Sequence, residues 1–204
     1  TGPNTGGMGS YSQPSQDLWN DQMEDEVRTA IMEPVVQGLM EMGNPYKGVL
    51  YAGLMITTQG PKVVEFNCRL GDPETQVVLP KLRSDLLEVM QGAAEGDLGD
   101  GTLDWDPRPC VGVVIASGGY PNDYRTGYPI DGLEEVNHTV NLFHADTKIS
   151  EYPDGRSRYV TAGGRILTVS ALGNSRSAAR EAAYAQADQI RFTDSYYRMD
   201  IASD

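Results

Sequence analysis

Apolar and polar residues alternate along residues 62–70, which predicts a β-strand with two unlike faces. One face carries apolar side chains, which we expect to lie against a core. They are Val64, Phe66, Cys68 and Leu70. A second strand-like run at residues 49–57 is joined to the first by a turn at 58–61, so the two runs predict a β-hairpin.

Helical spacing of apolar residues predicts helix over residues 23–42, where Pro34 either kinks one helix or opens a second. Asp72 is expected to cap a short helix, with Pro73 at its first position. Ser84 is a candidate cap for another helix. Ser175 is expected to cap an alanine-rich helix that runs to residue 190.

A stretch rich in Gly, Asp and Pro at residues 96–109 predicts a domain boundary, which divides the chain into residues 1–98 and 99–204. Beyond the break, residues 110–116, 136–144 and 165–171 are predicted strands. The pattern indicates an α+β protein, with antiparallel strands and flanking helices followed by a small β-rich domain.

The chain of 204 residues has a formal net charge of −13. This charge disfavours sequence-independent binding to nucleic acid or to an anionic membrane, since both require clustered cations. Two cysteines form no disulfide framework, and no apolar run is long enough for a membrane helix. We therefore expect a cytoplasmic protein without nucleic-acid or membrane partners.

The polar face of the 62–70 strand presents Glu65, Asn67 and Arg69 together. A carboxylate and an amide oxygen are hard ligands that suit Mg²⁺, and a guanidinium can neutralise a phosphoryl group during transfer. The alternative is a plain polar face with a salt bridge between Glu65 and Arg69, and the short pattern alone leaves both interpretations open.

The opening segment, TGPNTGGMGS, is the second candidate site. Its glycines allow backbone N–H groups to fold toward an anion, and Asn4 and Thr5 add side-chain donors. The segment lacks both the GK[ST] ending of a Walker A loop and the glycine spacing of a dinucleotide-binding loop. The alternative is a flexible loop without anchors, which we expect to be mobile.

Three further side chains are of types that can bind metals or act as nucleophiles, but their positions in the sequence do not favour such a role. Cys68 is predicted to be an inert core thiol, because no cation adjoins it on the apolar face. His138 and His144 would share a strand face, but no third metal ligand accompanies them.

The two candidate segments closely resemble signature segments of phosphoribosylamine–glycine ligases, also called glycinamide ribonucleotide synthetases. The resemblance rests on TGPNTGGMGSYS and VVEFNCRLGDPETQVVLP. It continues through VGVVIASGGYPNDY, LFHADT, VTAGGRILTVSALG and YYRMDIA. The shorter E-x-N-x-R pattern resembles the wider ATP-grasp superfamily.

The resemblance implies ATP-dependent ligation of glycine to 5-phosphoribosylamine through glycyl phosphate, in de novo purine biosynthesis. It implies that Glu65 and Asn67 bind Mg²⁺ or Mn²⁺ against the phosphates of ATP. It assigns Arg69 to charge stabilisation at the acyl phosphate. The loop residues Asn4, Thr5, Gly6 and Gly7 match the family's loop on the phosphoribosylamine side.

The resemblance also implies a C-terminal fragment, because the chain starts at Thr1 without Met inside a glycine-rich loop. Residues 1–98 would be the C-terminal part of an ATP-grasp domain, and 99–204 the C-terminal domain of the ligase family. The partner would be the missing N-terminal half, and the fragment alone is expected to be inactive. Two alternatives remain, namely a non-catalytic module that pairs with another polypeptide and a different ATP-grasp ligase.

Overall fold

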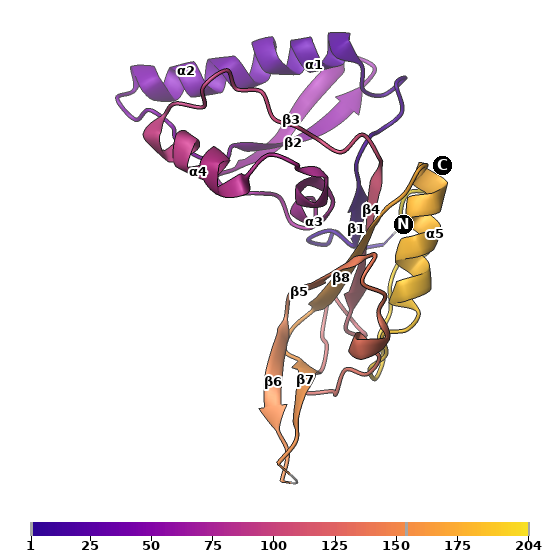
Figure 1. Ribbon diagram of the computed structural model, residues 1–204. Helices are drawn as coiled ribbons and strands as arrows, with labels where there is room; N and C mark the ends of the chain where they lie inside the picture. Colours follow the sequence, from indigo (N-terminus) through magenta and orange to yellow (C-terminus); the bar gives the residue numbers. More distant parts are fainter. Residues whose placement is uncertain (1, 154, 204) are drawn as a thin grey trace. The chain divides into compact units, whose positions relative to one another are not determined.

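The computed structural model describes residues 2–153 and 155–203 (Figure 1). Thr1, which begins the predicted opening loop, lies outside the described residues. Contacts divide the chain into two compact units. The first combines Thr1–Ser12, Asp72–Lys81 and Asp106–Asp204, and the second combines Gln13–Gly71 and Leu82–Trp105. Each unit thus combines segments that are separate in the sequence, whereas the predicted boundary divides the chain once, between residues 98 and 99. That boundary stays a prediction.

The first unit is built on an antiparallel sheet with the strand order β1-β4-β8-β5. These strands are β1 (Gly9–Tyr11), β4 (Cys110–Ala116), β8 (Arg165–Leu172) and β5 (Asn141–His144). Every residue of β4 is buried, as its continuous apolar run favours. The predicted strands at 110–116 and 165–171 are confirmed. The third predicted strand is shorter than expected, since residues 136–140 precede β5.

Helix α5 (Arg176–Ala187) packs on β4 and β8 (Figure 1). Ser175 caps it as predicted, because its side-chain oxygen accepts a hydrogen bond from the Ala178 N–H. The helix ends at Ala187, three residues before the predicted end. Fully buried Ala179 and Ala183 let the helix approach the sheet closely, and together with the β4 and β8 side chains they form the main core.

The hairpin of β6 (Thr147–Glu151) and β7 (Ser157–Thr161) was not expected from the sequence. It lies at the end of the unit away from β1 (Figure 1). The unit also holds the short helix α3 (Thr75–Val78) and the 3₁₀ turns Leu79–Lys81 and Leu133–Glu135.

The second unit contains the predicted hairpin, formed by β2 (Tyr51–Thr57) and β3 (Gly60–Asn67). The predicted helix is a continuous run of α1 (Asp21–Val27), a π-helical turn (Arg28–Met32) and α2 (Glu33–Glu41). Pro34 directly follows the π-helical turn, so the missing N–H falls beside a local irregularity of one continuous helix and does not open a second one. Helix α4 (Leu86–Glu95) is capped by Asp85, one residue after the predicted Ser84.

The expected core contact of the apolar β3 face is wrong for this chain. Val64 is 66% exposed, Phe66 is 37% exposed, and Cys68 is exposed as well. Among the described residues of this unit, Val27 is the one buried large hydrophobic side chain. Alternation therefore located the faces of the strand, but it could not indicate what covers them.

In the described ranges, no helix combines the length and the apolar character that a membrane crossing requires.

Candidate functional site

Glu65 and Asn67 lie two residues apart on β3, and their side chains meet. Asn67 Nδ2 donates a hydrogen bond of 2.8 Å to Glu65 Oε1. Side chains two apart on a strand share a face, so this contact follows from the strand geometry. The other two side-chain oxygens, Asn67 Oδ1 and Glu65 Oε2, take no part in this hydrogen bond.

The neighbouring strand accommodates the pair through a glycine. Gly53 pairs with Glu65 across the hairpin, and a Cβ atom at Gly53 would stand 3.3 Å from Glu65 Cγ. The register shifts directly afterwards, between Gly53 and Leu54. Such bulges bend a strand and redirect its side chains, so the irregularity lies next to the carboxylate that the sequence singles out.

Arg69 follows the end of β3. Its Nη1 donates a hydrogen bond of 2.9 Å to the Leu70 carbonyl, which ties the guanidinium to adjacent backbone. The structure thus brings Glu65 and Asn67 together directly, whereas it places Arg69 by a separate local contact. Cys68 lies between Asn67 and Arg69 in sequence. The Tyr46 hydroxyl donates to the Val49 carbonyl at 2.7 Å, and the pKa of Tyr46 is raised by burial and further by the Cys68 thiol.

Glu65 and Asn67 fit a hard divalent cation. In the parts of the chain that the structure describes, His, Cys, Asp and Glu residues form no group of three that could hold a metal ion. One carboxylate and one amide oxygen match the mode typical of Mg²⁺, in which one or two protein oxygens are completed by water and substrate phosphates. Mn²⁺ accepts the same kind of oxygen donors.

The opening loop belongs to the other compact unit, and residues distant in sequence hold it. The Gly6 N–H donates to the Tyr120 hydroxyl at 3.0 Å, and the Gly6 carbonyl accepts from Arg165 Nη1 at 2.8 Å. The Gly7 N–H donates to Thr5 Oγ1 at 3.2 Å. The expectation of a loop without anchors is therefore wrong.

These bonds change the role expected of the glycines. The N–H groups of Gly6 and Gly7 are used within the protein, so they do not point freely toward an anion. The side chains of Asn4 and Thr5 are exposed, and they remain the loop's candidate donors to a substrate.

Asp72 pairs with Arg165 and does not cap a helix, so the capping prediction is wrong. Arg165 Nη2 lies 2.7 Å from Asp72 Oδ2, and Nη1 lies 3.3 Å from Oδ1. Glu74 occupies the N-cap of α3 without a side-chain bond. Sequence reasoning missed Arg165, because the pair is separated by 93 residues and no local pattern connects them.

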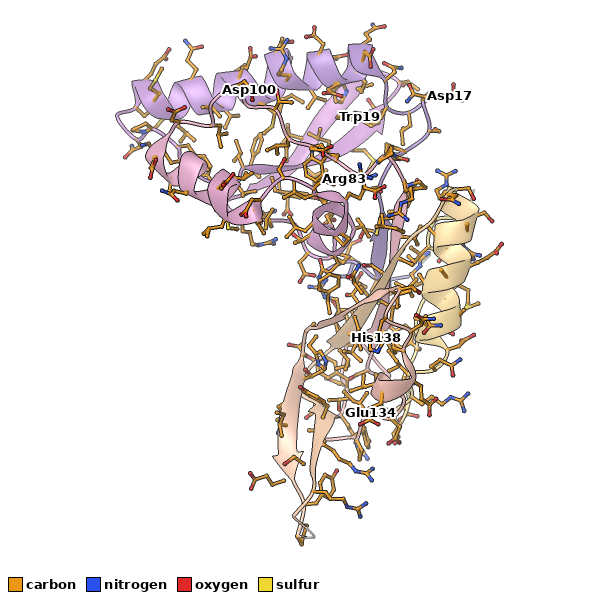
Figure 2. The ribbon with its side chains drawn as sticks, viewed as in Figure 1. Asp17, Trp19, Arg83, Asp100, Glu134 and His138 are labelled. Atoms are coloured by element: carbon orange, nitrogen blue, oxygen red, sulfur yellow. The ribbon has the colours of Figure 1, made fainter. Side chains whose placement is uncertain are left out.

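The structure does not place the two histidines on one strand, as the predicted strand over residues 136–144 would have done. His138 precedes β5 and is exposed (Figure 2). His144 Nδ1 lies 2.9 Å from Thr147 Oγ1, and its ring packs on Tyr159 with centroids 4.6 Å apart. Partial burial lowers the pKa of His144. No group of three metal-binding residues among the described ones includes them.

Two family models match the chain. Residues 1–75 match the model described as phosphoribosylglycinamide synthetase, ATP-grasp (A) domain. Residues 110–204 match the model described as phosphoribosylglycinamide synthetase, C domain.

Curated relatives agree with these matches. Phosphoribosylamine–glycine ligase of Allochromatium vinosum is 48% identical over 202 residues, which cover 98% of this chain and 46% of that protein. The ligase of Escherichia coli K12 is 48% identical over 204 residues, with the same coverage. The chain thus spans about half the length of the curated relatives it matches.

Solved structures show the same likeness. Phosphoribosylamine–glycine ligase from Thermotoga maritima superposes with a TM-score of 0.77 at 30% identity, over 98% of this chain and 48% of that one. A biotin carboxylase from Campylobacter jejuni gives a TM-score of 0.55 at 13% identity, over 93% of this chain and 40% of that one. The second likeness concerns the fold alone, and it supports the α+β, ATP-grasp-like architecture expected from the sequence.

Proposed function

Because the chain belongs to the phosphoribosylglycinamide synthetase family, we propose that it forms part of a carbon–nitrogen ligase that joins glycine to 5-phosphoribosylamine. ATP would be consumed, and the products would be glycinamide ribonucleotide, ADP and phosphate, as a step of de novo purine biosynthesis. The proposal concerns the whole ligase, of which this chain spans about half the length.

The reaction explains the residue types at the candidate site. A carboxylate is a poor electrophile with a poor leaving group, and phosphorylation by ATP to glycyl phosphate corrects both defects. The amine of phosphoribosylamine then attacks the activated carbonyl, forming the amide bond and releasing phosphate. Both steps concentrate negative charge on phosphoryl oxygens, so cationic groups near them stabilise the transition states.

We assign Glu65 and Asn67 to holding Mg²⁺ or Mn²⁺ beside the phosphates of ATP. When bound, the ion would neutralise phosphoryl charge. The hydrogen bond between Asn67 Nδ2 and Glu65 Oε1 orients both side chains, so their remaining oxygens are set in advance. Arg69 is exposed, and its guanidinium is assigned to the developing charge on the acyl phosphate.

The loop Asn4–Gly7 is assigned to the phosphoribosylamine side. Asn4 and Thr5 would contact the sugar phosphate through their side chains, while Gly6 and Gly7 would set the position of the loop backbone. The single observation that carries the proposal is the joined Glu65–Asn67 pair, within a chain whose relatives at 48% identity bear the ligase name.

The test measures formation of glycinamide ribonucleotide by the full-length ligase with ATP, glycine, phosphoribosylamine and Mg²⁺. We expect E65A and N67A to lower kcat by about 100-fold or more, because each removes an oxygen ligand of the metal ion whose charge would offset the negative charge of the transition state. Their thermal unfolding midpoints should stay near that of the unmodified enzyme, since Glu65 is exposed, Asn67 is half-buried, and neither belongs to the main core.

The matched control is E41A in α2, a carboxylate of the same unit that accepts a bond from Gln37 Nε2. It should retain ordinary turnover. Ordinary turnover in both E65A and N67A would contradict the metal assignment, and absence of product with the unmodified enzyme would contradict the function itself.

A further inference from the structure

The geometry points to Arg165 as a positioning residue for the phosphoribosylamine loop, and we propose that it sets the position of Gly6 and Gly7 from the start of β8. The inference rests on the function proposed above for that loop. Arg165 contacts both the loop, at Gly6, and Asp72.

Arg165 reaches two separate segments with one guanidinium. Nη1 donates to the Gly6 carbonyl at 2.8 Å, and the Nη1 and Nη2 pair spans both carboxylate oxygens of Asp72 at 3.3 and 2.7 Å. Nη1 also lies 3.3 Å from the Asp72 carbonyl. A planar guanidinium can make this fork, whereas a lysine ammonium binds as a point charge without the same directions.

Arg165 is the more shielded partner of the pair. The Arg165 side chain is 21% exposed and that of Asp72 is 46% exposed. Gln76 Nε2 donates to Asp72 Oδ1 at 2.9 Å, which holds the carboxylate from the side of α3. Arg165 itself is fixed by the strand, because it pairs with Ala116 across β4 and β8.

Glycines keep the loop close to its supports. A Cβ atom on Gly6 would stand 3.3 Å from Arg165 Cζ and 3.2 Å from the Tyr120 hydroxyl. Gly7 adopts a φ of +99°, and a Cβ atom there would stand 2.5 Å from Pro73 Cδ. The backbone of the loop thus lies directly against Arg165 and the Asp72–Pro73 turn.

Tyr120 completes the support from the other side of Gly6. Its hydroxyl accepts from the Gly6 N–H, so both polar groups of Gly6 are bonded to residues of the later half of the chain. Gly164, which precedes Arg165, leaves room for the Tyr120 ring, because a Cβ atom there would stand 2.3 Å from Tyr120 Cδ2. The arrangement fixes where Asn4 and Thr5 present their side chains.

The kinetic test compares R165K with the unmodified full-length ligase. We expect the KM for phosphoribosylamine to rise by about 10- to 100-fold, since small displacements of a positioning group have effects of that size. The KM for ATP should stay within about twofold, because the proposed metal ligands lie elsewhere in the chain. R158K, at an exposed arginine that faces Asp131 at 3.7 Å, is the matched control and should leave all constants unchanged.

The structural test is independent of activity and uses the 204-residue chain. Hydrogen exchange of the Gly6 and Gly7 amides should accelerate in R165K and in Y120F, while β4 amides keep their protection. Unchanged exchange at Gly6 and Gly7 in R165K would overturn the proposal even if the ligase activity is as proposed. A general loss of protection, or an equal rise of every KM, would also overturn it, because it would indicate a purely structural role. Accelerated exchange in a protein without ligase activity would instead contradict the proposed function alone.

Discussion

The two cysteines show how differently one residue type can be placed in this chain. Cys110 lies in β4 with no exposed surface, and burial raises the pKa of its thiol to about 11. Cys68 follows β3 and is exposed. The sequence-based expectation of an inert core thiol therefore describes Cys110, although it was made for Cys68.

The difference predicts selective alkylation. With iodoacetamide at pH 8 the folded 204-residue chain should gain one label, at Cys68, because the Cys110 thiol is both protonated and covered. Mass spectrometry of peptides identifies the labelled site. In denaturant both cysteines should react, and preferential labelling of Cys110 in the folded chain would contradict the structure.

At the scale of elements, local signals located α5, the β2–β3 hairpin and the core strands β4 and β8. Each combines a regular pattern with a clear end signal, such as Ser175 before α5 or the turn at Gly60. The sequence failed where a contact is distant. The Asp72-Pro73 pattern is typical of a helix cap, whereas the partner that Asp72 binds, Arg165, lies 93 residues away in the sequence.

The same limit applies to the candidate site. Strand alternation was enough to bring Glu65 and Asn67 together, since side chains two apart share a face. The support of the opening loop by Tyr120 and Arg165 depends on how the β-sheet aligns its strands, and no local pattern encodes that alignment. The alternation also identified the apolar face of β3, but it did not indicate that this face is exposed.

Helix α5 offers a direct test of its capping signal. S175A should lower the free energy of unfolding by about 1 kcal/mol, because the Ala178 N–H loses its acceptor. S177A is the control two residues later. Its exposed hydroxyl donates to Glu181 Oε1 at 3.2 Å, a surface contact, so its effect should stay within about 0.5 kcal/mol. Urea denaturation measures both, and equal losses would refute the capping role.

For the whole molecule, the two compact units differ in how much apolar surface they bury. The first contains the main core, from Val111 in β4 to Ile166 in β8. Among its described residues the second has Val27 as its one buried large hydrophobic, while Met55, Val64 and Leu87 are each more than half exposed. Stability should therefore be uneven between the units.

Hydrogen exchange checks this unevenness. In the 204-residue chain, amides of β2 and β3 should exchange faster than amides of β4 and β8, although all four strands are hydrogen bonded. Because the second unit buries few apolar side chains, the β2–β3 hairpin can open locally without unfolding of the main core. Equal protection in the two pairs of strands would show that the second unit is stabilised in another way.

Nucleotide binding tests how much of the proposed ligase this chain represents. It spans about half the length of its relatives, and Glu65 and Asn67 supply two oxygens toward a metal and ATP. We expect a dissociation constant for MgATP weaker than about 1 mM in calorimetry of the 204-residue chain. Tight binding would mean that these residues already contain the main nucleotide contacts.

The pairing of β1 with β4 has a practical consequence for anyone dividing this protein. A piece beginning at residue 99 would lose β1, whose three residues pair with Val111, Gly112 and Val113. The backbone N–H and C=O groups on that side of β4 would then be free to pair with a strand of another molecule. An unpaired edge strand of this kind promotes aggregation through edge-to-edge strand pairing. Covalently joining residues 1–12 to the later segment through a flexible linker should restore a soluble monomer.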